Sequence, residues 1–350
     1  MRRRSLHDYD PAVVNSGLPD PRPMVTDELI EELSVRFQLD RTTKWRDLGG
    51  SRSVNLLVRG GHDDALVVRI HRWSTTAERL DAEQEVRRLL AEAGVPTVVA
   101  LATRRLRSGH LVELERYVPS DGRMNTCERL LTGFAHLARL HEVLRRSELP
   151  EATRMTVAAN HIGLHAAAAA TRRGAERIRG WSLPRLAAFT DRAVNLIEAV
   201  TEAERHWDMN RIEQVVHGDF WDNNVPFLGA RLQAILDFGF MAQRLRVDDL
   251  ALPFWFYLLE PQRRVPGEAE RRFLRALLDS YDRAAGRPLS FPERMSLPLV
   301  VARQPAWSVG GWIVQLDDES ARHHALDVAT ELEVAEAIWR DVRLWQEALV

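Results

Sequence analysis

Residues 215–239 read Val-Val-His-Gly-Asp-Phe-Trp-Asp-Asn-Asn-Val-Pro-Phe-Leu-Gly-Ala-Arg-Leu-Gln-Ala-Ile-Leu-Asp-Phe-Gly. One apolar run leads into Asp219, and a second apolar run leads into Asp237. Asn224 follows Asp219 after four intervening residues, and Gly229 marks a turn between the two runs. Apolar runs that alternate with turn residues predict a strand, loop, strand, turn, strand arrangement. The three polar side chains are therefore expected to lie near one another on the loops.

The residue types at these three positions suit the transfer of a phosphoryl group. The transferred group is highly charged, and positioning and charge neutralisation account for most of its catalysis. Asp219 would accept the proton of an acceptor hydroxyl, Asn224 would offer a carbonyl oxygen to Mg²⁺, and Asp237 would bridge the metal to the nucleotide phosphates. Each residue alone is common in ordinary turns, but the combination at this spacing favours a catalytic loop.

The motifs resemble those of a known family. His217-Gly218-Asp219 with Asn224, then Asp237-Phe238-Gly239 and Asp248-Asp249-Leu250-Ala251, is similar to the aminoglycoside phosphotransferase family. Residues 222–227 are also similar to the type II homoserine kinases, which share that fold. The resemblance implies an α+β, protein-kinase-like fold of two lobes with ATP and Mg²⁺ between them. The N-lobe would hold a small five-stranded antiparallel sheet, and the larger C-lobe would be mainly helical.

Composition narrows the classes of partner. The 350 residues include 48 basic and 50 acidic side chains, so no positive field favours nucleic acid or an anionic membrane. Cys127 is the single cysteine and cannot form an internal disulfide. The basic start, residues 1–4, is followed by polar residues in place of a signal-peptide core, and the apolar run 251–259 is too short to span a membrane. These features predict a soluble cytoplasmic protein, with its oligomeric state left open.

The chain is expected to divide into an arm and two lobes. Residues 1–25 contain several prolines and no periodicity, which predicts a poorly ordered arm. Thr26 should cap the first helix of an N-lobe at 26–117, and the C-lobe should occupy 118–350. The strands of the sheet are predicted at 44–48, 53–58, 65–71, 97–103 and 110–117.

Candidate nucleotide-binding residues lie in the N-lobe. Gly49, Gly50 and Ser51 form a turn whose amides could close over phosphates, although a plain hairpin explains it equally well. Arg69 stands where kinases carry the lysine of Val-Ala-Ile-Lys. The resemblance implies that Glu83, on the following helix, pairs with Arg69, with Glu85 as the alternative partner.

Two further groups of residues are expected in the C-lobe. His217 and Asp249 are predicted to support the catalytic loop, Asp249 by a hydrogen bond back to it. Candidate acceptor contacts are Arg303 and the acidic trio Asp317, Asp318 and Glu319, because the family lines its acceptor cleft with C-terminal helices. The tryptophans between these positions, at 307 and 312, are interpreted as core more readily than as part of the acceptor site.

The sequence therefore predicts an ATP-dependent phosphotransferase. Its acceptor would be a hydroxyl of a small molecule, an antibiotic or other sugar-like natural product. Trp221 stands where many protein kinases have a lysine, which also favours a small acceptor. The alternatives are a homoserine or amino-alcohol kinase, a protein kinase, and a pseudokinase binding module. GTP in place of ATP stays open.

Overall fold

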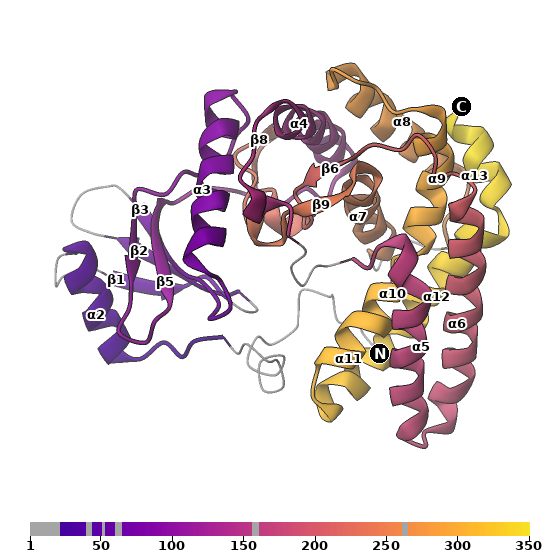
Figure 1. The fold of residues 1–350 in the computed structure, drawn as a ribbon, viewed down its shortest axis with the longest axis horizontal. Coiled ribbons are helices and arrows are strands. Elements are labelled where there is room, and N and C mark those ends of the chain that lie inside the picture. The colour runs from indigo at the N-terminus through magenta and orange to yellow at the C-terminus, as the bar shows by residue number, and fades with distance from the viewer. Residues whose placement is uncertain (1–21, 40–43, 51–52, 60–64, 156–160, 261–264) are drawn as a thin grey trace.

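Five antiparallel strands form the sheet of the N-terminal lobe (Figure 1). The computed structural model describes residues 22–39, 44–50, 53–59, 65–155, 161–260 and 265–350. Within them the strand order is β1-β2-β3-β5-β4. The strands are β1 (Lys44–Asp47), β2 (Val54–Arg59), β3 (Ala65–Ile70), β4 (Ala102–Arg105) and β5 (Leu111–Arg116).

The two faces of this sheet differ because side chains alternate along each strand. One face is apolar and packs with Leu33 of helix α2 (Asp27–Phe37), which Thr26 caps by accepting a hydrogen bond from Leu29 N. The opposite face carries a polar row across four strands, because Arg69 lies between Asn55 and Glu113, and Glu113 pairs with Thr103. Helix α3 (Ala77–Glu92) covers that polar face and lies between the sheet and the C-terminal lobe (Figure 1).

The strand predicted at 97–103 is wrong. Thr97 forms only an isolated bridge with Ile235, and β4 begins at Ala102. Thr97 Oγ1 also donates a hydrogen bond of 3.0 Å to the carbonyl of Ile235. The β-branched run therefore connects the two lobes instead of extending the sheet.

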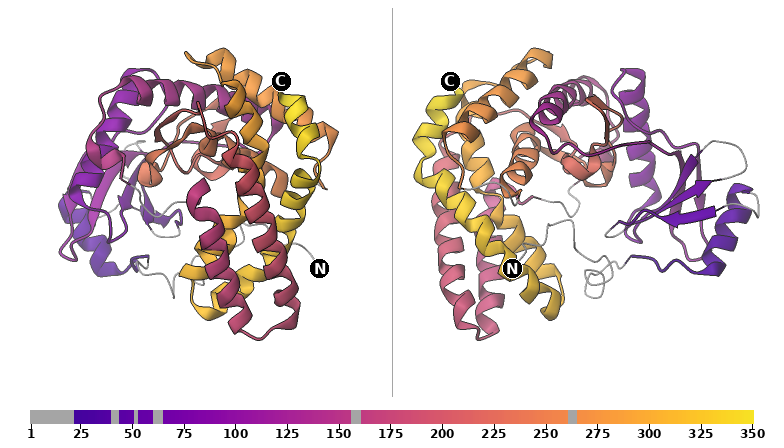
Figure 2. Two further views of the ribbon diagram at one scale, coloured as in Figure 1. Left: turned by 45° about the vertical axis from the view of Figure 1, so that its right-hand side comes forward. Right: turned by 180° about the vertical axis from the view of Figure 1, so that it is seen from behind.

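The C-terminal lobe is mainly helical (Figures 1 and 2). Two short strand pairs lie at its boundary with the sheet: β6 (Glu213–Val216) with β9 (Ala242–Leu245), and β7 (Phe227–Leu228) with β8 (Arg231–Leu232). The long helices are α4 (Cys127–Arg146), α5 (Leu164–Gly180), α6 (Pro184–Arg205), α7 (Arg246–Leu259), α8 (Glu268–Ala284), α9 (Phe291–Ala302), α12 (Asp318–Arg340) and α13 (Val342–Leu349). Three short segments connect α9 to α12: α10 (Pro305–Trp307), a π-helical turn at Ser308–Trp312, and α11 (Ile313–Gln315).

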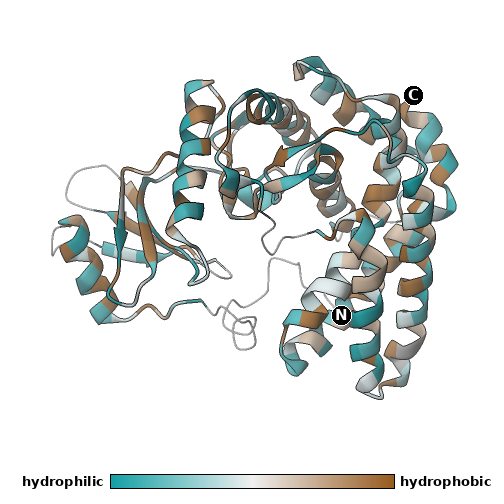
Figure 3. Cartoon of the chain, viewed as in Figure 1, coloured by the Kyte–Doolittle hydropathy of each residue, from teal (hydrophilic) through white to brown (hydrophobic). Residues whose placement is uncertain are grey.

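Hydrophobic and hydrophilic bands alternate along most of these helices (Figure 3). Their apolar sides meet in one large core that includes Phe134, Phe254 and Trp345. The predicted α+β, two-lobed fold is thus confirmed. No helix in the described ranges has the length and apolarity needed to cross a bilayer. The predicted arm lies largely outside the described residues.

Candidate active site

A tight loop follows strand β6 and lies at the junction of the lobes. Gly218 has φ of 77°, and a Cβ at this position would lie 2.2 Å from the carbonyl oxygen of Phe240. A side chain there would meet both left-handed strain and a backbone clash, so glycine is required. The turn places Asp219 in a nearly buried position at the edge of the cleft between the lobes.

Asp249 holds this loop from the first turn of α7. Its carboxylate accepts hydrogen bonds from the backbone N–H of His217, at 2.7 Å, and of Gly218, at 2.8 Å. His141 Nε2 lies 3.1 Å from the same carboxylate, which is fully buried. Burial raises the pKa of Asp249, but hydrogen bonding and charge from His141 outweigh this and lower it to about 2. The hydrogen bond expected from Asp249 to the loop is therefore present, and His217 also contacts the carbonyl of Leu236 at 3.0 Å.

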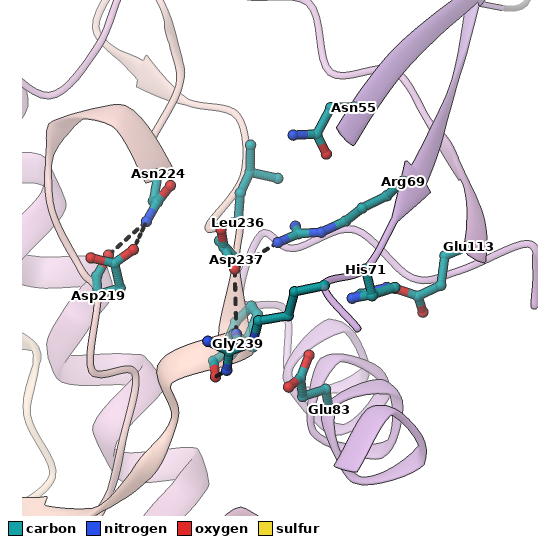
Figure 4. Close-up of polar contacts among 12 residues, drawn as sticks. Asn55, Arg69, His71, Glu83, Glu113, Asp219, Asn224, Leu236, Asp237 and Gly239 are labelled. Atoms are coloured by element: carbon teal, nitrogen blue, oxygen red, sulfur yellow. Dashed lines mark hydrogen bonds and ion pairs between the residues drawn. The ribbon is translucent and has the colours of Figure 1, made fainter. Parts of the chain in front are cut away.

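Asn224 is fixed in orientation by Asp219. The Asn224 amide nitrogen donates hydrogen bonds to Asp219 Oδ2, at 2.7 Å, and to the Asp219 carbonyl, at 2.9 Å (Figure 4). Because the amide nitrogen donates to Asp219, the amide oxygen points away from Asp219 and can still accept a hydrogen bond or bind a cation. Asp219, Asn224 and Asp237 all line the same cleft, of about 850 Å³.

Asp237 faces the loop from the other side of this cleft. Its backbone is left-handed, with φ of 63°, and its carboxylate accepts a hydrogen bond from Gly239 N. Arg69 Nη2 lies 2.6 Å from Asp237 Oδ1 (Figure 4). Burial raises the pKa of Asp237, but the charge and hydrogen bond of Arg69, together with His217 and the N–H of Gly239, outweigh burial and lower this pKa below its ordinary value.

The predicted ion pair between Glu83 and Arg69 is wrong. Glu83 instead binds Arg79, one helical turn earlier, at 3.0 Å. Arg79 in turn donates to the carbonyls of Ala152 and Met241, so this pair anchors α3 to the C-lobe. Glu83 is paired with Arg79, four residues earlier on the same helix. Asp237 is the carboxylate that pairs with Arg69.

Glu85, the alternative partner, pairs with Arg88 at the surface, at 2.6 Å. Glu113 lies directly opposite Arg69 on β5. It contacts His71 at 2.8 Å and also pairs with Arg87. Burial raises the pKa of Glu113, yet these neighbours bring it down to about 2. This buried carboxylate was not singled out from the sequence, although an acid inside an apolar strand is an available signal.

The glycine turn at Gly49 and Gly50 lines the cleft from the N-lobe. Gly49 and Gly50 have φ of 92° and 125°. Asn55 Nδ2 donates a hydrogen bond of 3.0 Å to the Gly49 carbonyl, and Asp47 accepts one of 2.8 Å from Gly49 N. Ser51 lies outside the described residues.

The prediction that Arg303 contacts the acceptor is wrong. It is 1% exposed, and its guanidinium binds Glu204 at 2.7 Å and Asp248 at 2.8 Å. A buried arginine held by two carboxylates has no capacity left for a substrate. Its role is to join α9, α6 and α7.

The prediction that the acidic trio contacts the acceptor is also wrong. Asp317 caps α12, accepting from Glu319 N and Ser320 N. Asp318 pairs with Arg177 at 2.8 Å, and Glu319 is exposed. None of the three lines the cleft.

Aromatic side chains line the cleft instead, together with one acidic residue of α12. The lining includes Trp221, Trp255, Phe256, Trp307, Trp312 and Glu331. The tryptophans at 307 and 312 therefore belong to the cleft more than to the core. Glu331 was missed, although it stands between Val328 and Ala335 on the apolar side of its helix, which a 3.6-residue period would have marked.

Comparison with known proteins agrees with this geometry. The model of the phosphotransferase enzyme family matches residues 44–289. The chain belongs to this family. Its match covers the sheet, the glycine turn, the loop at Asp219 and α8. Most of the residues that line the cleft of this phosphotransferase family member lie within the matched region, whereas Trp307, Trp312 and Glu331 lie beyond it.

Individual relatives are more distant. Over 97 residues the chain is 36% identical to a homoserine kinase of Nitrobacter hamburgensis, which covers 28% of this chain and 28% of that kinase. Among solved structures, aminoglycoside 2'-phosphotransferase-IIIa bound to GDP gives a TM-score of 0.62 at 16% identity, over 88% of this chain and 98% of the other. An amicoumacin kinase in complex with AMP-PNP and Ca²⁺ gives 0.61 at 12% identity, over 88% and 96%. At these identities the structural matches establish the fold.

The donor atoms present fit a hard divalent cation that is shared with a nucleotide. The described residues contain no group of three or more His, Cys, Asp or Glu able to hold a metal unaided. Asp237 and the Asn224 amide oxygen offer two oxygen ligands, and Mg²⁺ commonly takes one or two protein carboxylates plus phosphate oxygens and water. These two oxygen atoms therefore fit a divalent cation whose other ligands are phosphate oxygens and water.

Proposed function

We propose that this phosphotransferase moves the γ-phosphoryl group of ATP, supplied with Mg²⁺, to a hydroxyl of a small molecule. The observation that carries the proposal is the hydrogen bond between Asn224 and Asp219, which faces Asp237 within one cleft. The proposed proton acceptor Asp219 and its neighbour Asn224 thereby face Asp237 across the space that a transferred phosphoryl group needs. A pseudokinase would be expected to have lost at least one of these three residues, and all are present.

Each residue has a chemical task in this proposal. The Asp219 carboxylate accepts the proton of the acceptor hydroxyl as it attacks, and the Asn224 amide keeps that carboxylate in position. Asn224 and Asp237 would hold the Mg²⁺, whose charge neutralises the phosphates when it is bound. Arg69 reaches the same phosphates through its planar guanidinium. The amides of the turn at Gly49 and Gly50 cover them from the N-lobe.

We further propose that the acceptor is an antibiotic or similar natural product. A cleft of about 850 Å³, which also has to admit nucleotide phosphates, lies at the upper end of the usual range of ligand pockets. Homoserine would need a cation for its carboxylate, and the arginine expected to provide it, Arg303, is occupied by Glu204 and Asp248. The homoserine kinase relatives match over 27% to 38% of their length, so their acceptor does not transfer to this chain.

The test is a panel of acceptors assayed for ATP consumption, with mass spectrometry of the products. The panel contains aminoglycosides, nucleoside antibiotics, amicoumacin, homoserine, choline and a generic protein, each with ATP or GTP. Support requires a phosphorylated small molecule that forms with the wild-type chain and not with Asp219→Asn. Turnover of homoserine or protein alone would replace the antibiotic assignment. Nucleotide binding without turnover of any acceptor would favour a binding module.

A further inference from the structure

One end of the cleft is built from aromatic rings. Trp221 of the catalytic loop lies against Phe256 of α7, with ring centroids 4.3 Å apart. Trp307 and Trp312, from the segment after α9, meet edge to face at 5.8 Å. All four residues line the cleft, so a molecule bound there meets aromatic surfaces from three separate parts of the chain.

A π-helical turn at Ser308–Trp312 positions this segment. The backbones of the turn and of α5 approach closely, because a Cβ on Gly310 would lie 2.5 Å from the Ala170 carbonyl carbon. A Cβ on Gly174 would likewise lie 2.0 Å from the Val309 carbonyl oxygen. Glycine at both contacts lets α5 pack closely against the turn. Ser308 and Trp312 of the turn line the cleft. Such turns are rare and occur frequently at functional sites.

Glu331 brings a carboxylate to this aromatic end. It is 5% exposed, it lines the cleft, and Ser308 Oγ donates a hydrogen bond of 2.6 Å to its Oε2. Burial raises the pKa of Glu331 to about 7 despite that hydrogen bond. Asp219 and Asp237 are the other carboxylates that line the described cleft, and both belong to the phosphoryl-transfer site.

We propose that this end of the cleft selects an acceptor with an apolar or aromatic body and a single protonated amine, and that Glu331 binds the amine. The aromatic faces of Trp307 and Trp312 would bind the body and attract its positive charge. A charge-assisted hydrogen bond to Glu331 would then fix the orientation of the acceptor. A compound with many amines would bury most of its charges at this end without a carboxylate partner, which is costly. We call the ligand an acceptor on the basis of the proposed function, but this inference concerns binding alone.

The experiment measures binding of matched compounds by isothermal titration calorimetry in the presence of Mg·AMP-PNP. The probes are 2-amino-1-phenylpropane-1,3-diol, its neutral counterpart 1-phenylpropane-1,2,3-triol, and the polycation kanamycin. The variants are Glu331→Gln, which can still accept from Ser308, and Glu333→Gln, an exposed position of the same helix. Thermal unfolding of each variant is recorded alongside.

The wild-type chain should bind the aminodiol about tenfold or more tightly than the triol, since a charged hydrogen bond contributes 1.4 kcal/mol or more. Glu331→Gln should reduce this ratio to near unity, Glu333→Gln should retain it, and kanamycin should bind more weakly than the aminodiol. An equal ratio in Glu331→Gln and wild type, no binding of the aminodiol, or tighter binding of kanamycin would overturn the proposal. Equal weakening of both phenyl compounds would reduce Glu331 to a structural role and also overturn it. Because no turnover is required, absence of phosphoryl transfer would count against the proposed function and not against this inference.

Discussion

Arg69 Nη2 lies 2.6 Å from Asp237 Oδ1, and this ion pair joins strand β3 of the N-lobe to the Asp-Phe-Gly turn of the C-lobe. Burial lowers the pKa of Arg69, but Asp237 and the nearby Glu115 and Glu113 outweigh it, so the pKa is raised and the guanidinium stays charged. A nucleotide with its cation would compete for both partners. We therefore expect nucleotide binding to weaken this ion pair between the lobes.

Removal of the proposed proton acceptor tests the chemistry. Asp219→Asn should lower kcat by about 10²-fold or more while nucleotide affinity stays within about twofold, because a positioned base acts mainly on the chemical step. The measurement is a coupled ADP assay with an acceptor from the panel, and AMP-PNP binding by calorimetry. Asp81→Asn, at an exposed position of α3, is the control and should behave as wild type. Full turnover by Asp219→Asn would show that the base is elsewhere.

Removal of the guanidinium tests the phosphate contact. Arg69→Ala should raise the KM for ATP by about tenfold to a hundredfold, as expected for loss of a charged hydrogen bond, and change the KM for the acceptor little. Initial rates at varied ATP give the value. Arg59→Ala, exposed on the neighbouring strand, controls for a general loss of positive charge. If Arg69→Ala has wild-type ATP kinetics, the ion pair with Asp237 is structural only.

The buried carboxylate of Asp249 predicts a pH dependence of stability. Its folded pKa of about 2 is below the ordinary unfolded value of about 3.9, so its contribution is present above about pH 4 and is lost as the pH falls through about 2. The Asp249→Asn variant should lose roughly 2–4 kcal/mol of unfolding free energy at pH 7, and this difference from wild type should shrink on acidification. Urea unfolding at several pH values measures it, with Asp81→Asn as control. A stability difference that does not change with pH would contradict the assignment.

Two glycines with positive φ form a matched pair. Gly218→Ala should destabilise the protein by several kcal/mol, because its Cβ would clash with the Phe240 carbonyl at 2.2 Å. Gly229→Ala, at φ of 59° with no atom within 4 Å of its Cβ, should cost only about 1–2 kcal/mol of backbone strain. Chemical denaturation of both variants gives the two free energies. Equal losses would show that the loop relaxes and that the close backbone approach at Gly218 is not a constraint.

Local spacing was sufficient to predict the catalytic loop and its surroundings. Asp219, Asn224 and Asp237 occupy short loops at the ends of apolar segments, so their separation in space follows from a few adjacent turns. The contact from Asp249 to the loop was also predictable, since it comes from the motif that follows directly. The cap at Thr26 and four of the sheet strands follow from local preferences of the same kind.

Long-range choices of partner could be decided only by the tertiary structure. Several carboxylates compete for Arg69, and packing of α3 gives Glu83 to Arg79 and leaves Asp237 for Arg69. The same holds for Arg303, which an apolar flanking sequence does not distinguish from a substrate contact until Glu204 and Asp248 are seen beside it.

The acceptor end shows this division between sequence and structure most clearly. The sequence by itself was sufficient to predict a phosphotransferase and the loop at Asp219 to which we assign the transfer, because that chemistry is encoded by residue types at short and fixed spacing. It could not determine that Trp307, Trp312 and Glu331 meet Trp221 in one cleft, because these residues come from elements separated by many positions. Their meeting depends on the packing of α5 against the π-helical turn and of α12 beside it, and the energy of that packing is spread over the whole C-lobe core.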